Sequence, residues 1–418
     1  MTFGELRLLL EPEVLTLLDM YRSDDPSGFA MRFQGRKDIP VRAIAEQIAC
    51  SRKALKKLPA FSLKPMLYTS LALEQASGET TARYKASLAG GERLIDLSGG
   101  LGIDVLFFSK VFDEVVYCER DPVLAAIATY NFRLLGIKNV RIIEGDSLAA
   151  LHLFPEGHFD WIYADPARRE GGRRSIGLHA ASPDVVAAHD LLLSRARKVM
   201  LKASPAIELS VLHRQLPSLS QIHVVSVGGE CREVLLLLDR ELPSGTPESR
   251  KAVQLSPDGR AVRDVIGTGY EPREVAMLVG EYFYEPDAAI IKAGLAERLA
   301  ADLGLGFVNG SVDYLTSGRF IADFPGRTFL VAAVERYSPK TFPKFLTCAG
   351  ISGAAVQRRD FPLSPEDIRR KFRLRESDSN FLFFTRDPEG ELICVYGIKP
   401  AGAGAAPSLP DRNAVPGC

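Results

Sequence analysis

The chain has 418 residues, which is enough for two or three domains of ordinary size. Hydrophobic residues make up 46% of the sequence and charged residues 25%, the balance of a globular protein with sizeable cores. The 52 basic and 52 acidic residues cancel, which excludes a global polycation, so any surface for nucleic acid has to be local.

Two further classes of protein find no support in the sequence. The six cysteines and six histidines are scattered, without a Cys-x-x-Cys pair, so we expect no metal site. No apolar run is long enough to cross a bilayer, and no signal-peptide pattern opens the chain. We therefore expect a cytoplasmic protein without a membrane partner.

Residues 1–88 are expected to be helical. Apolar side chains between Val41 and Ile48 recur at the i, i+3, i+4, i+7 spacing of an amphipathic helix. The stretch 71–85 then carries several hydrogen-bonding side chains just before a predicted strand, which brings them close to the crevice that follows. The alternative is a helix–helix corner with capping residues.

A glycine-rich turn between a strand and a helix is the most informative stretch. The apolar run Leu94 to Leu97 predicts a buried strand, and Ile103 to Val111 has the apolar content of a helix. Gly99, Gly100 and Gly102 predict a tight turn, because a backbone that turns sharply and touches a ligand cannot carry a Cβ. This arrangement is typical of nucleotide sites, although the dinucleotide and P-loop signatures are both incomplete.

Acidic residues end the strands that follow. Glu119 closes one strand about 20 residues after the glycines, where a ribose-binding acid is expected. Asp146 and Asp165 follow the next two apolar runs in the same way. Because the carboxyl ends of parallel strands meet at one edge, we expect these side chains to face one crevice of a Rossmann-like α/β domain. The alternative is an α/β domain whose strand-end acids merely face solvent.

Three more strands are expected at 198–202, 222–227 and 232–238. The last two are joined by only four residues, 228–231, which is short enough for an antiparallel hairpin. Residues 241–262 are rich in Pro, Ser, Gly and charge, and they predict a domain junction.

The C-terminal part alternates predicted strands and helices from Thr328 onward. Ser364-Pro365-Glu366-Asp367 begins one of these helices with a capping-box pattern. Alternating units of this size favour a small sheet covered by helices on one face. Residues 400–418 are rich in Ala, Gly and Pro, and we expect a disordered tail.

The glycine turn and the acid-ended strands together resemble class I S-adenosylmethionine-dependent methyltransferases. The resemblance implies a seven-stranded sheet that ends in an antiparallel hairpin, with S-adenosylmethionine as cofactor. It also implies that Asp96 lies near the methionine amino end, that Glu119 binds the ribose hydroxyls and that Asp146 meets the adenine amine. The first glycine of the family's Gly-x-Gly-x-Gly is Ser98 here, a departure tolerated in amino-methylating branches.

Flanking motifs narrow the resemblance to bacterial methyltransferases with a THUMP-like C-terminal domain. The stretch from Glu74 to Lys85 looks like the pre-motif of that family, and Tyr284-Glu285-Pro286 and 359–363 look like its C-terminal motifs. The helical lead-in is also similar to that of trimethylguanosine synthase. The organisation implied is a helical region at 1–88, a methyltransferase core at 89–240, a linker at 241–270, a ferredoxin-like segment at 271–327, a THUMP-like domain at 328–399 and a tail at 400–418. The cofactor-binding residues implied are Thr80, Tyr84, Lys85, Asp96, Ser98, Gly99, Gly100, Gly102, Asp104, Glu119, Arg120, Asp146 and Ser147.

The catalytic candidates are Asp165, Pro166 and Arg168. Methyltransferases that act on base amines carry Asn/Asp/Ser-Pro-Pro-aromatic at this point, and the chain keeps Asp-Pro but replaces the rest with Ala167-Arg168. The resemblance implies that Asp165 accepts a hydrogen bond from the amine. Arg168 could stack on a base or clamp a phosphate. The alternative is that Asp165 only caps a turn.

Two basic runs and the THUMP-like resemblance favour RNA as partner. The runs are an arginine loop at 168–174 and the cluster Arg369, Arg370, Lys371, Arg373 and Arg375, each of which can also be a solvated face. We expect methylation of an exocyclic amine in RNA, guanine N2 or adenine N6. The alternatives are methylation of a protein or small-molecule amine, and a non-catalytic S-adenosylmethionine-binding RNA-binding protein.

Overall fold

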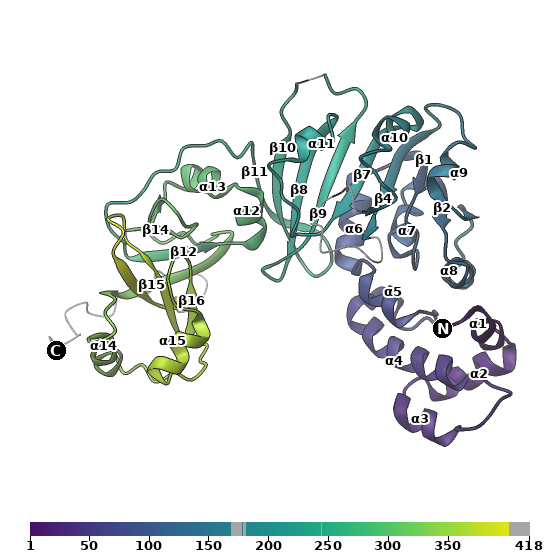
Figure 1. The fold of residues 1–418 in the computed structure, drawn as a ribbon, viewed down its shortest axis with the longest axis horizontal. Coiled ribbons are helices and arrows are strands. Elements are labelled where there is room, and N and C mark those ends of the chain that lie inside the picture. Colours follow the sequence, from purple (N-terminus) through teal and green to yellow (C-terminus); the bar gives the residue numbers. More distant parts are fainter. Residues whose placement is uncertain (169–177, 179–180, 244, 401–418) are drawn as a thin grey trace. The chain divides into compact units, whose positions relative to one another are not determined.

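The computed structural model describes residues 1–168, 178, 181–243 and 245–400 (Figure 1). The arginine loop beyond Arg168 and the tail beyond Pro400 lie outside these residues. The chain divides into two compact units. The first consists of Met1–Gly228, Arg232–Ser249 and Leu255–Val262, and the second consists of Gly229–Cys231, Arg250–Gln254 and the chain from Arg263 onward.

Helices make up the segment before the first strand. Leu18, Ile44 and Ile48 from three turns of this segment are fully buried, as the spacing of its apolar residues leads one to expect. Asn131 ties the segment to the sheet layer, because its side-chain amide exchanges two hydrogen bonds of 2.9 Å with the backbone of Leu67. The elements are α1 (Phe3–Leu9), α2 (Pro12–Tyr21), α3 (Pro26–Arg32), α4 (Val41–Lys57), η1 (Pro59–Phe61), α5 (Ser70–Gln75) and α6 (Glu79–Leu88).

The seven strands predicted for the core are all present in one sheet (Figure 1). Neighbouring strands follow the order β8-β9-β7-β4-β1-β2-β3. The strands β7, β4, β1, β2 and β3 are parallel, and β9 runs antiparallel to β7. These strands are β1 (Gly91–Asp96), β2 (Phe112–Glu119), β3 (Val140–Glu144), β4 (Phe159–Ala164), β7 (Ala196–Ala203), β8 (Leu219–Val227) and β9 (Glu230–Asp239).

The parallel strands read as continuous apolar runs because both faces of the sheet are covered. Ile95, Val115, Ile162 and Val199 from four neighbouring strands are fully buried. Since the connections cross from one strand to the next, all carboxyl ends of the parallel strands meet at one edge. The helices between strands are α7 (Ile103–Phe108), α8 (Pro122–Leu134), α9 (Ser147–Leu151), α10 (His189–Arg195) and α11 (Leu212–Gln215), and a small two-stranded sheet consists of β5 (Ala167–Arg168) and β6 (Ala181–Ser182).

Two strands that the sequence patterning did not reveal lie within residues 241–270, the stretch that the family resemblance implied as a linker. They are β10 (Ser249–Leu255) and β11 (Ala261–Gly267). Ala252 and Val253 are buried, but charged residues precede them and turn-forming residues surround the hairpin. The strand pattern is therefore too short to stand out against a polar background.

The second unit contains a seven-stranded sheet of order β13-β14-β12-β15-β18-β17-β16. Only β16 and β17 pair in parallel among the pairings recorded for it. Its strands are β12 (Tyr282–Pro286), β13 (Gly306–Phe307), β14 (Leu315–Ser317), β15 (Gly326–Arg336), β16 (Ala355–Arg358), β17 (Asn380–Arg386) and β18 (Leu392–Ile398), and its helices are α12 (Ala288–Ala293), α13 (Ala296–Leu303), α14 (Phe342–Cys348) and α15 (Pro365–Phe372).

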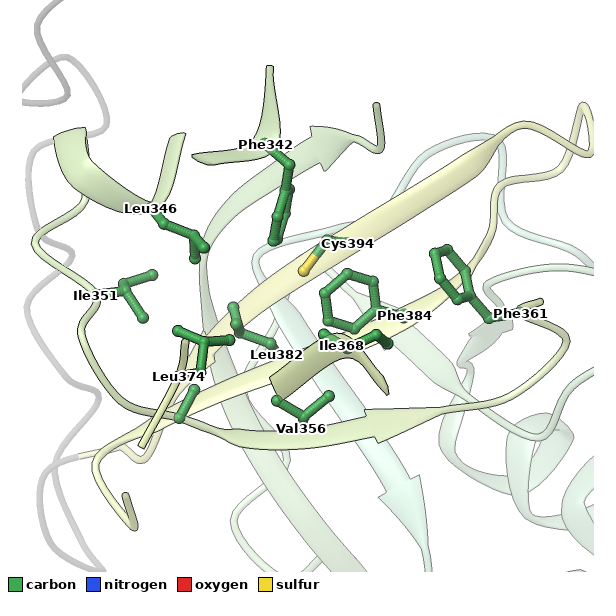
Figure 2. Close-up of a cluster of buried hydrophobic side chains, with 11 residues drawn as sticks. Phe342, Leu346, Ile351, Val356, Phe361, Ile368, Leu374, Leu382, Phe384 and Cys394 are labelled. Carbon is green, nitrogen blue, oxygen red and sulfur yellow. The ribbon is translucent and has the colours of Figure 1, made fainter. Parts of the chain in front are cut away.

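Both faces of this sheet are buried, which explains the apolar run in β17. Leu382 and Phe384 pack against α14 and α15 in the cluster drawn in Figure 2, whereas Phe381 and Phe383 belong to a second cluster. This alternation follows from the two-residue period of a strand. The expected covering of one face by helices is therefore present.

The two C-terminal stretches with family resemblance come together in the second unit. Nη2 of Arg359 lies 3.1 Å from Oε1 of Glu285, and its guanidinium group sits 4.4 Å from the ring centre of Tyr314. Two residues that are 74 positions apart in the chain thus form one ion pair.

Candidate active site

The turn after β1 is fixed by hydrogen bonds from its own side chains. Asp96 is the last residue of β1, and its Oδ1 accepts hydrogen bonds from the amide and the hydroxyl of Ser98 at 2.8 and 3.0 Å. The amide of Gly99 donates to the carbonyl of Cys118 at 2.9 Å. The turn is therefore held against the carboxyl end of β2.

Glycine is required at two positions of this turn by close neighbours. A Cβ on Gly99 would lie 2.2 Å from Cε2 of Tyr117, and a Cβ on Gly102 would lie 2.6 Å from Cζ of Phe132. Gly102 also has a φ of 73°, a left-handed conformation that favours glycine. The hydroxyl of Tyr117 donates to the carbonyl of Gly100 at 2.5 Å, so the ring that excludes a side chain also anchors the turn.

Glu119 lies directly beside the glycine turn, at the end of β2. Its Oε2 accepts a hydrogen bond from the amide of Gly100 at 2.7 Å, and its Oε1 accepts one from the amide of Asp121 at 2.8 Å. The carboxylate is therefore oriented by backbone groups on both sides, at the position where the family places its ribose-binding acid.

The end of β3 lies next to that of β2. The amide of Gly145 donates to the carbonyl of Glu119 at 2.9 Å, which brings Asp146 to the same edge. Asp146 caps α9, because its Oδ1 accepts from the amide of Ala149 at 2.8 Å, and Ser147 is the first residue of that helix. Nη1 of Arg120 donates to the hydroxyl of Ser182 at 3.3 Å.

The buried carboxyl of Asp96 fits a cationic ligand group. Asp96 is 1% exposed, and this burial raises the pKa of its carboxyl to about 8, although the hydrogen bonds from Ser98 oppose the shift. Its Oδ2 has no hydrogen-bond partner in the part of the chain that the structure describes. An ammonium group would supply both the missing partner and the missing positive charge. These features, with the oriented Glu119 carboxylate, fit S-adenosylmethionine.

A buried ionic cluster lies between the helical lead-in and the sheet. Nζ of Lys85, on α6, lies 2.9 Å from Oε2 of Glu233 on β9 and 3.2 Å from Oδ1 of Asp104 on α7. Ser77 donates to Oδ2 of Asp104 at 2.8 Å, and the hydroxyl of Tyr163 donates to the same oxygen at 2.8 Å. Two lysine–carboxylate contacts therefore join three elements in the interior.

The cluster keeps Asp104 charged. Burial opposes its ionisation, but the nearby ammonium groups of Lys85 and Lys202 and the two hydroxyl donors lower the pKa of its carboxyl below the usual value. Lys85 and Asp104 were both predicted to bind the cofactor. The structure pairs them with each other and gives each of them further partners within the protein.

The remaining predicted residues of the lead-in also have protein partners. The hydroxyl of Thr80 donates to the carbonyl of Pro257 at 2.8 Å. The hydroxyl of Tyr84 is hydrogen-bonded to Nδ1 of His223 at 2.9 Å. Neither contact is with the glycine turn.

Asp165 and Pro166 follow the end of β4, and Asp165 is tied to the glycine turn. Its amide donates to the hydroxyl oxygen of Ser98 at 2.6 Å. Its Oδ2 accepts a hydrogen bond from Nζ of Lys202 at 2.5 Å. Arg168 pairs through its backbone with Ala181 in the β5–β6 sheet, and its side chain lies outside the described part of the chain.

Lys202 is a site residue that sequence reasoning missed. It lies in β7, which pairs with β4 so that Leu201 is opposite Ala164. Lys202 follows Leu201 in the chain, and Asp165 follows Ala164. The sequence did contain a signal that could have found it. Lys202 ends a predicted apolar strand, just as the acidic site candidates do. Nζ of Lys57 donates to the carbonyls of Leu73 and Glu74 at 2.7 and 2.8 Å, and burial together with the charge of Lys202 lowers the pKa of its ammonium to about 8.

The described residues contain neither a cluster of metal-ligating side chains nor a helix able to span a membrane. No group of three or more His, Cys, Asp or Glu side chains in the described ranges could hold a metal ion. Among the helices that the structure describes, none combines the length and apolar content needed to cross a bilayer.

Comparison with known proteins matches both parts of the chain. The family described as THUMP domain-like matches residues 326–396. A protein from two strains of Mycobacterium tuberculosis, named as an uncharacterised S-adenosylmethionine-dependent methyltransferase, is 27% identical over 365 residues, which cover 86% of this chain and 97% of the relative.

A solved structure extends the similarity to the whole fold. The crystal structure of a candidate methyltransferase from Porphyromonas gingivalis W83 is 28% identical and has a TM-score of 0.84. The match covers 96% of this chain and 100% of that one. With the strand order and the glycine turn described above, these matches identify the chain as a class I S-adenosylmethionine-dependent methyltransferase with a THUMP-like C-terminal domain, and S-adenosylmethionine as its cofactor.

Proposed function

We propose that this enzyme methylates an exocyclic amine of a base in RNA, at guanine N2 or adenine N6. The observation that carries the proposal is the hydrogen bond of 2.6 Å between the amide of Asp165 and the hydroxyl oxygen of Ser98. Ser98 belongs to the turn assigned to the methyl donor, and Asp165 begins the Asp-Pro pair assigned to the acceptor. This contact supports the proposal, because it joins the turn assigned to the donor to the pair assigned to the acceptor.

The Asp165 carboxylate suits an amine acceptor. S-adenosylmethionine supplies an electrophilic methyl group, and its transfer by in-line displacement requires a nucleophile whose lone pair is aligned with that group. Lys202 holds Oδ2 of Asp165, whereas Oδ1 has no hydrogen-bond partner within the described ranges. We assign Oδ1 to accept a hydrogen bond from the amine, orient its lone pair and receive the proton that the nitrogen releases.

Support for RNA as the acceptor comes from the C-terminal part of the chain. The THUMP-like match covers residues 326–396, and this region includes the basic run from Arg369 to Arg375. Because a neutral protein needs a local basic surface to hold a polyanion, this run is the place where phosphate contact is expected.

A second candidate function rests on one feature of the acceptor motif. Ala167 and Arg168 replace the second proline and the aromatic residue on which amino methyltransferases of the family stack a base. This loss favours a non-catalytic protein that binds S-adenosylmethionine and RNA. Methylation of a protein or small-molecule amine is the remaining alternative.

The test is methyl transfer from labelled S-adenosylmethionine to total RNA of a deletion strain, followed by digestion and mass spectrometry of the nucleosides. Label in N2-methylguanosine or N6-methyladenosine supports the proposal. Asp165→Ala should abolish it, whereas Asp165→Asn, which keeps an acceptor oxygen, should retain part of the activity.

Donor binding separates the alternatives in the same experiment. Asp165→Ala should keep the thermal shift that S-adenosylmethionine produces in the wild type, because the residue is assigned to the acceptor. Donor binding without transfer to any RNA would favour the non-catalytic function. Label that appears in protein or in small molecules of the extract, and not in RNA, would replace the proposed acceptor.

A further inference from the structure

The basic run at 369–375 in the second unit contains two kinds of side chain. Arg369 donates to Oε1 of Glu376 at 3.1 Å, and Arg370 donates to Oδ1 of Asp367 at 2.5 Å. Each of these two guanidinium groups is therefore already neutralised by a carboxylate. Their charge is less available to an external anion than their number suggests.

Lys371, Arg373 and Arg375 differ from their two neighbours. All three are exposed, and none has an ion-pair partner among the residues that the structure describes. All three also line a single hollow of about 580 Å³. This volume falls in the range of small-molecule and nucleotide pockets, roughly 300–1,000 Å³. None of the described residues that line the hollow is acidic.

Apolar side chains make up part of the lining of the hollow, alongside the polar Thr347 and Ser352. Leu346 and Ile351 line it from α14 and the loop that follows, and Phe372 and Leu374 line it from the end of α15. Figure 2 places Leu346, Ile351 and Leu374 at one end of the buried cluster, away from Phe361. These three side chains are 6–8% exposed, so the hollow borders the edge of a packed core, and the half-buried ring of Phe372 beside them adds an aromatic surface.

Backbone geometry fixes the basic wall in place. Arg373 ends α15 in the left-handed conformation, with a φ of 54° and a ψ of 36°. A residue with a Cβ rarely adopts this conformation, and such residues are concentrated at functional sites. The amide of Arg375 then donates to the carbonyl of Ser352 at 3.2 Å, and its own carbonyl accepts from the amide of Ala354 at 2.9 Å. The end of the segment that carries the three cations is therefore tied to the residues that lead into β16.

We propose that this hollow binds an unpaired nucleotide of the RNA substrate, with phosphate groups on Lys371, Arg373 and Arg375 and the base against Phe372 and the apolar side chains beside it. Arginine and lysine side chains neutralise phosphates, and an apolar surface with an aromatic edge accepts the face of any base. A base within a duplex is stacked and its faces are covered, so the site selects an unpaired segment. The choice of RNA as the ligand rests on the proposed function.

The experiment compares two double variants of the full-length chain that remove the same charge. Lys371→Gln/Arg375→Gln alters the hollow, and Arg369→Gln/Arg370→Gln alters the two neutralised side chains of the same run. Binding of a fluorescent oligouridylate is followed by anisotropy over a series of salt concentrations. For single strands each phosphate contact contributes about 0.7 to the slope of log affinity against log salt. We expect the first variant to lose about 1.4 in slope, and the control to keep nearly the wild-type slope.

Three results would overturn the proposal. Equal loss of slope in both variants would mean that general charge, and not the hollow, attracts the RNA. An unchanged slope in the first variant would remove its cations from the interface. A duplex of the same length that competes as well as the single strand would remove the selection for unpaired nucleotides. Far-ultraviolet circular dichroism and thermal unfolding establish that each variant is folded.

The outcome is distinguishable from that of the proposed function. If the wild type methylates total RNA but both variants bind oligouridylate alike, the hollow is wrong and the methyltransferase function stands. If binding depends on the hollow but no RNA is methylated, the binding site stands and the proposed reaction is wrong.

Discussion

Nζ of Lys202 lies 2.5 Å from Oδ2 of Asp165, at the ends of two paired parallel strands. Burial alone would lower the pKa of the Lys202 ammonium, but the carboxylates of Asp165, Asp104 and Glu233 outweigh it and raise that pKa above its usual value. Lys202 therefore stays charged, and it holds one oxygen of Asp165 while leaving the other to the acceptor. This contact makes Lys202 a positioning residue for the assigned catalytic carboxylate.

Replacement of Lys202 by Met should lower turnover without changing the affinity for S-adenosylmethionine. Loss of the ion pair lets the Asp165 carboxylate rotate, and a loss of roughly 1.4 kcal/mol in alignment is a tenfold fall in kcat. Lys202→Arg should recover part of it. Lys198→Met is the matched control, because Lys198 lies in the same strand and its Nζ is 3.8 Å from Asp239. Equal effects at both positions would contradict a specific role for Lys202.

The parts of the site that could be predicted are those determined locally. The glycine turn and the acids at the ends of β1 to β4 can be recognised because each signal lies within a few consecutive residues. The strands show as short apolar runs, and the tight turn shows as a group of glycines. The methyltransferase fold followed from their order along the chain. The strands β10 and β11 did not, since charged and turn-forming residues obscure their few buried positions.

The contacts that could not be predicted join residues far apart in sequence. Lys85 and Glu233 are separated by 148 residues, and Asp165 and Lys202 by 37. No local pattern distinguishes a buried lysine in a helix from an exposed one, because the charge is satisfied only by partners that folding brings together. For the same reason the run 369–375 could be recognised as basic, while its division into paired and unpaired cations required the structure.

Replacement of Glu119 by Ala should greatly reduce the binding of S-adenosylmethionine. S-adenosylmethionine at about 100 times its Kd should stabilise the wild type by about 2.7 kcal/mol, which is a clear thermal shift. Glu119→Ala removes the assigned ribose acceptor and also frees the amide of Gly100, so most of that shift should disappear. Glu144→Ala is the control, since Glu144 ends the neighbouring strand and is exposed.

The specificity of the Glu119 effect is tested with other nucleotides. NAD and ATP should shift the wild type little, and Glu119→Ala should not change that result. A shift with NAD as large as that with S-adenosylmethionine would contradict the assignment of this turn to the methyl donor.

Replacement of Asp96 by Asn should alter how stability depends on pH. The folded-state pKa of Asp96 is raised from 3.8 to about 8, so the folded state holds a proton that the unfolded state has lost. The resulting stabilisation is complete below about pH 3.8, falls by about 1.4 kcal/mol per pH unit above it, and is lost once the pH passes about 8. Asp96→Asn should therefore gain stability relative to the wild type between these limits, as measured by urea unfolding at several pH values.

The same comparison in the presence of S-adenosylmethionine tests the ligand side. A cationic amino group beside Asp96 favours the ionised carboxylate, so the ligand should weaken the pH dependence of the wild type and leave that of Asp96→Asn unchanged. A difference between the two proteins that does not vary with pH, with or without ligand, would show that Asp96 does not titrate in this range.

Replacement of Lys85 by Met should destabilise the protein strongly, because it leaves two buried carboxylates without their common cation. The Lys85 and Glu233 side chains are 0% and 3% exposed, and breaking a buried ion pair by removing one partner costs about 3–5 kcal/mol. The double variant Lys85→Met/Glu233→Gln removes one of the two unpaired buried charges and should recover a large part of the loss.

Urea unfolding of the wild type, both single variants and the double variant closes a thermodynamic cycle, whose interaction term should be at least 1 kcal/mol in favour of the pair. Single-variant losses that simply add would mean that the two side chains contribute independently, and the cluster would then not be what fastens the helical lead-in to the sheet.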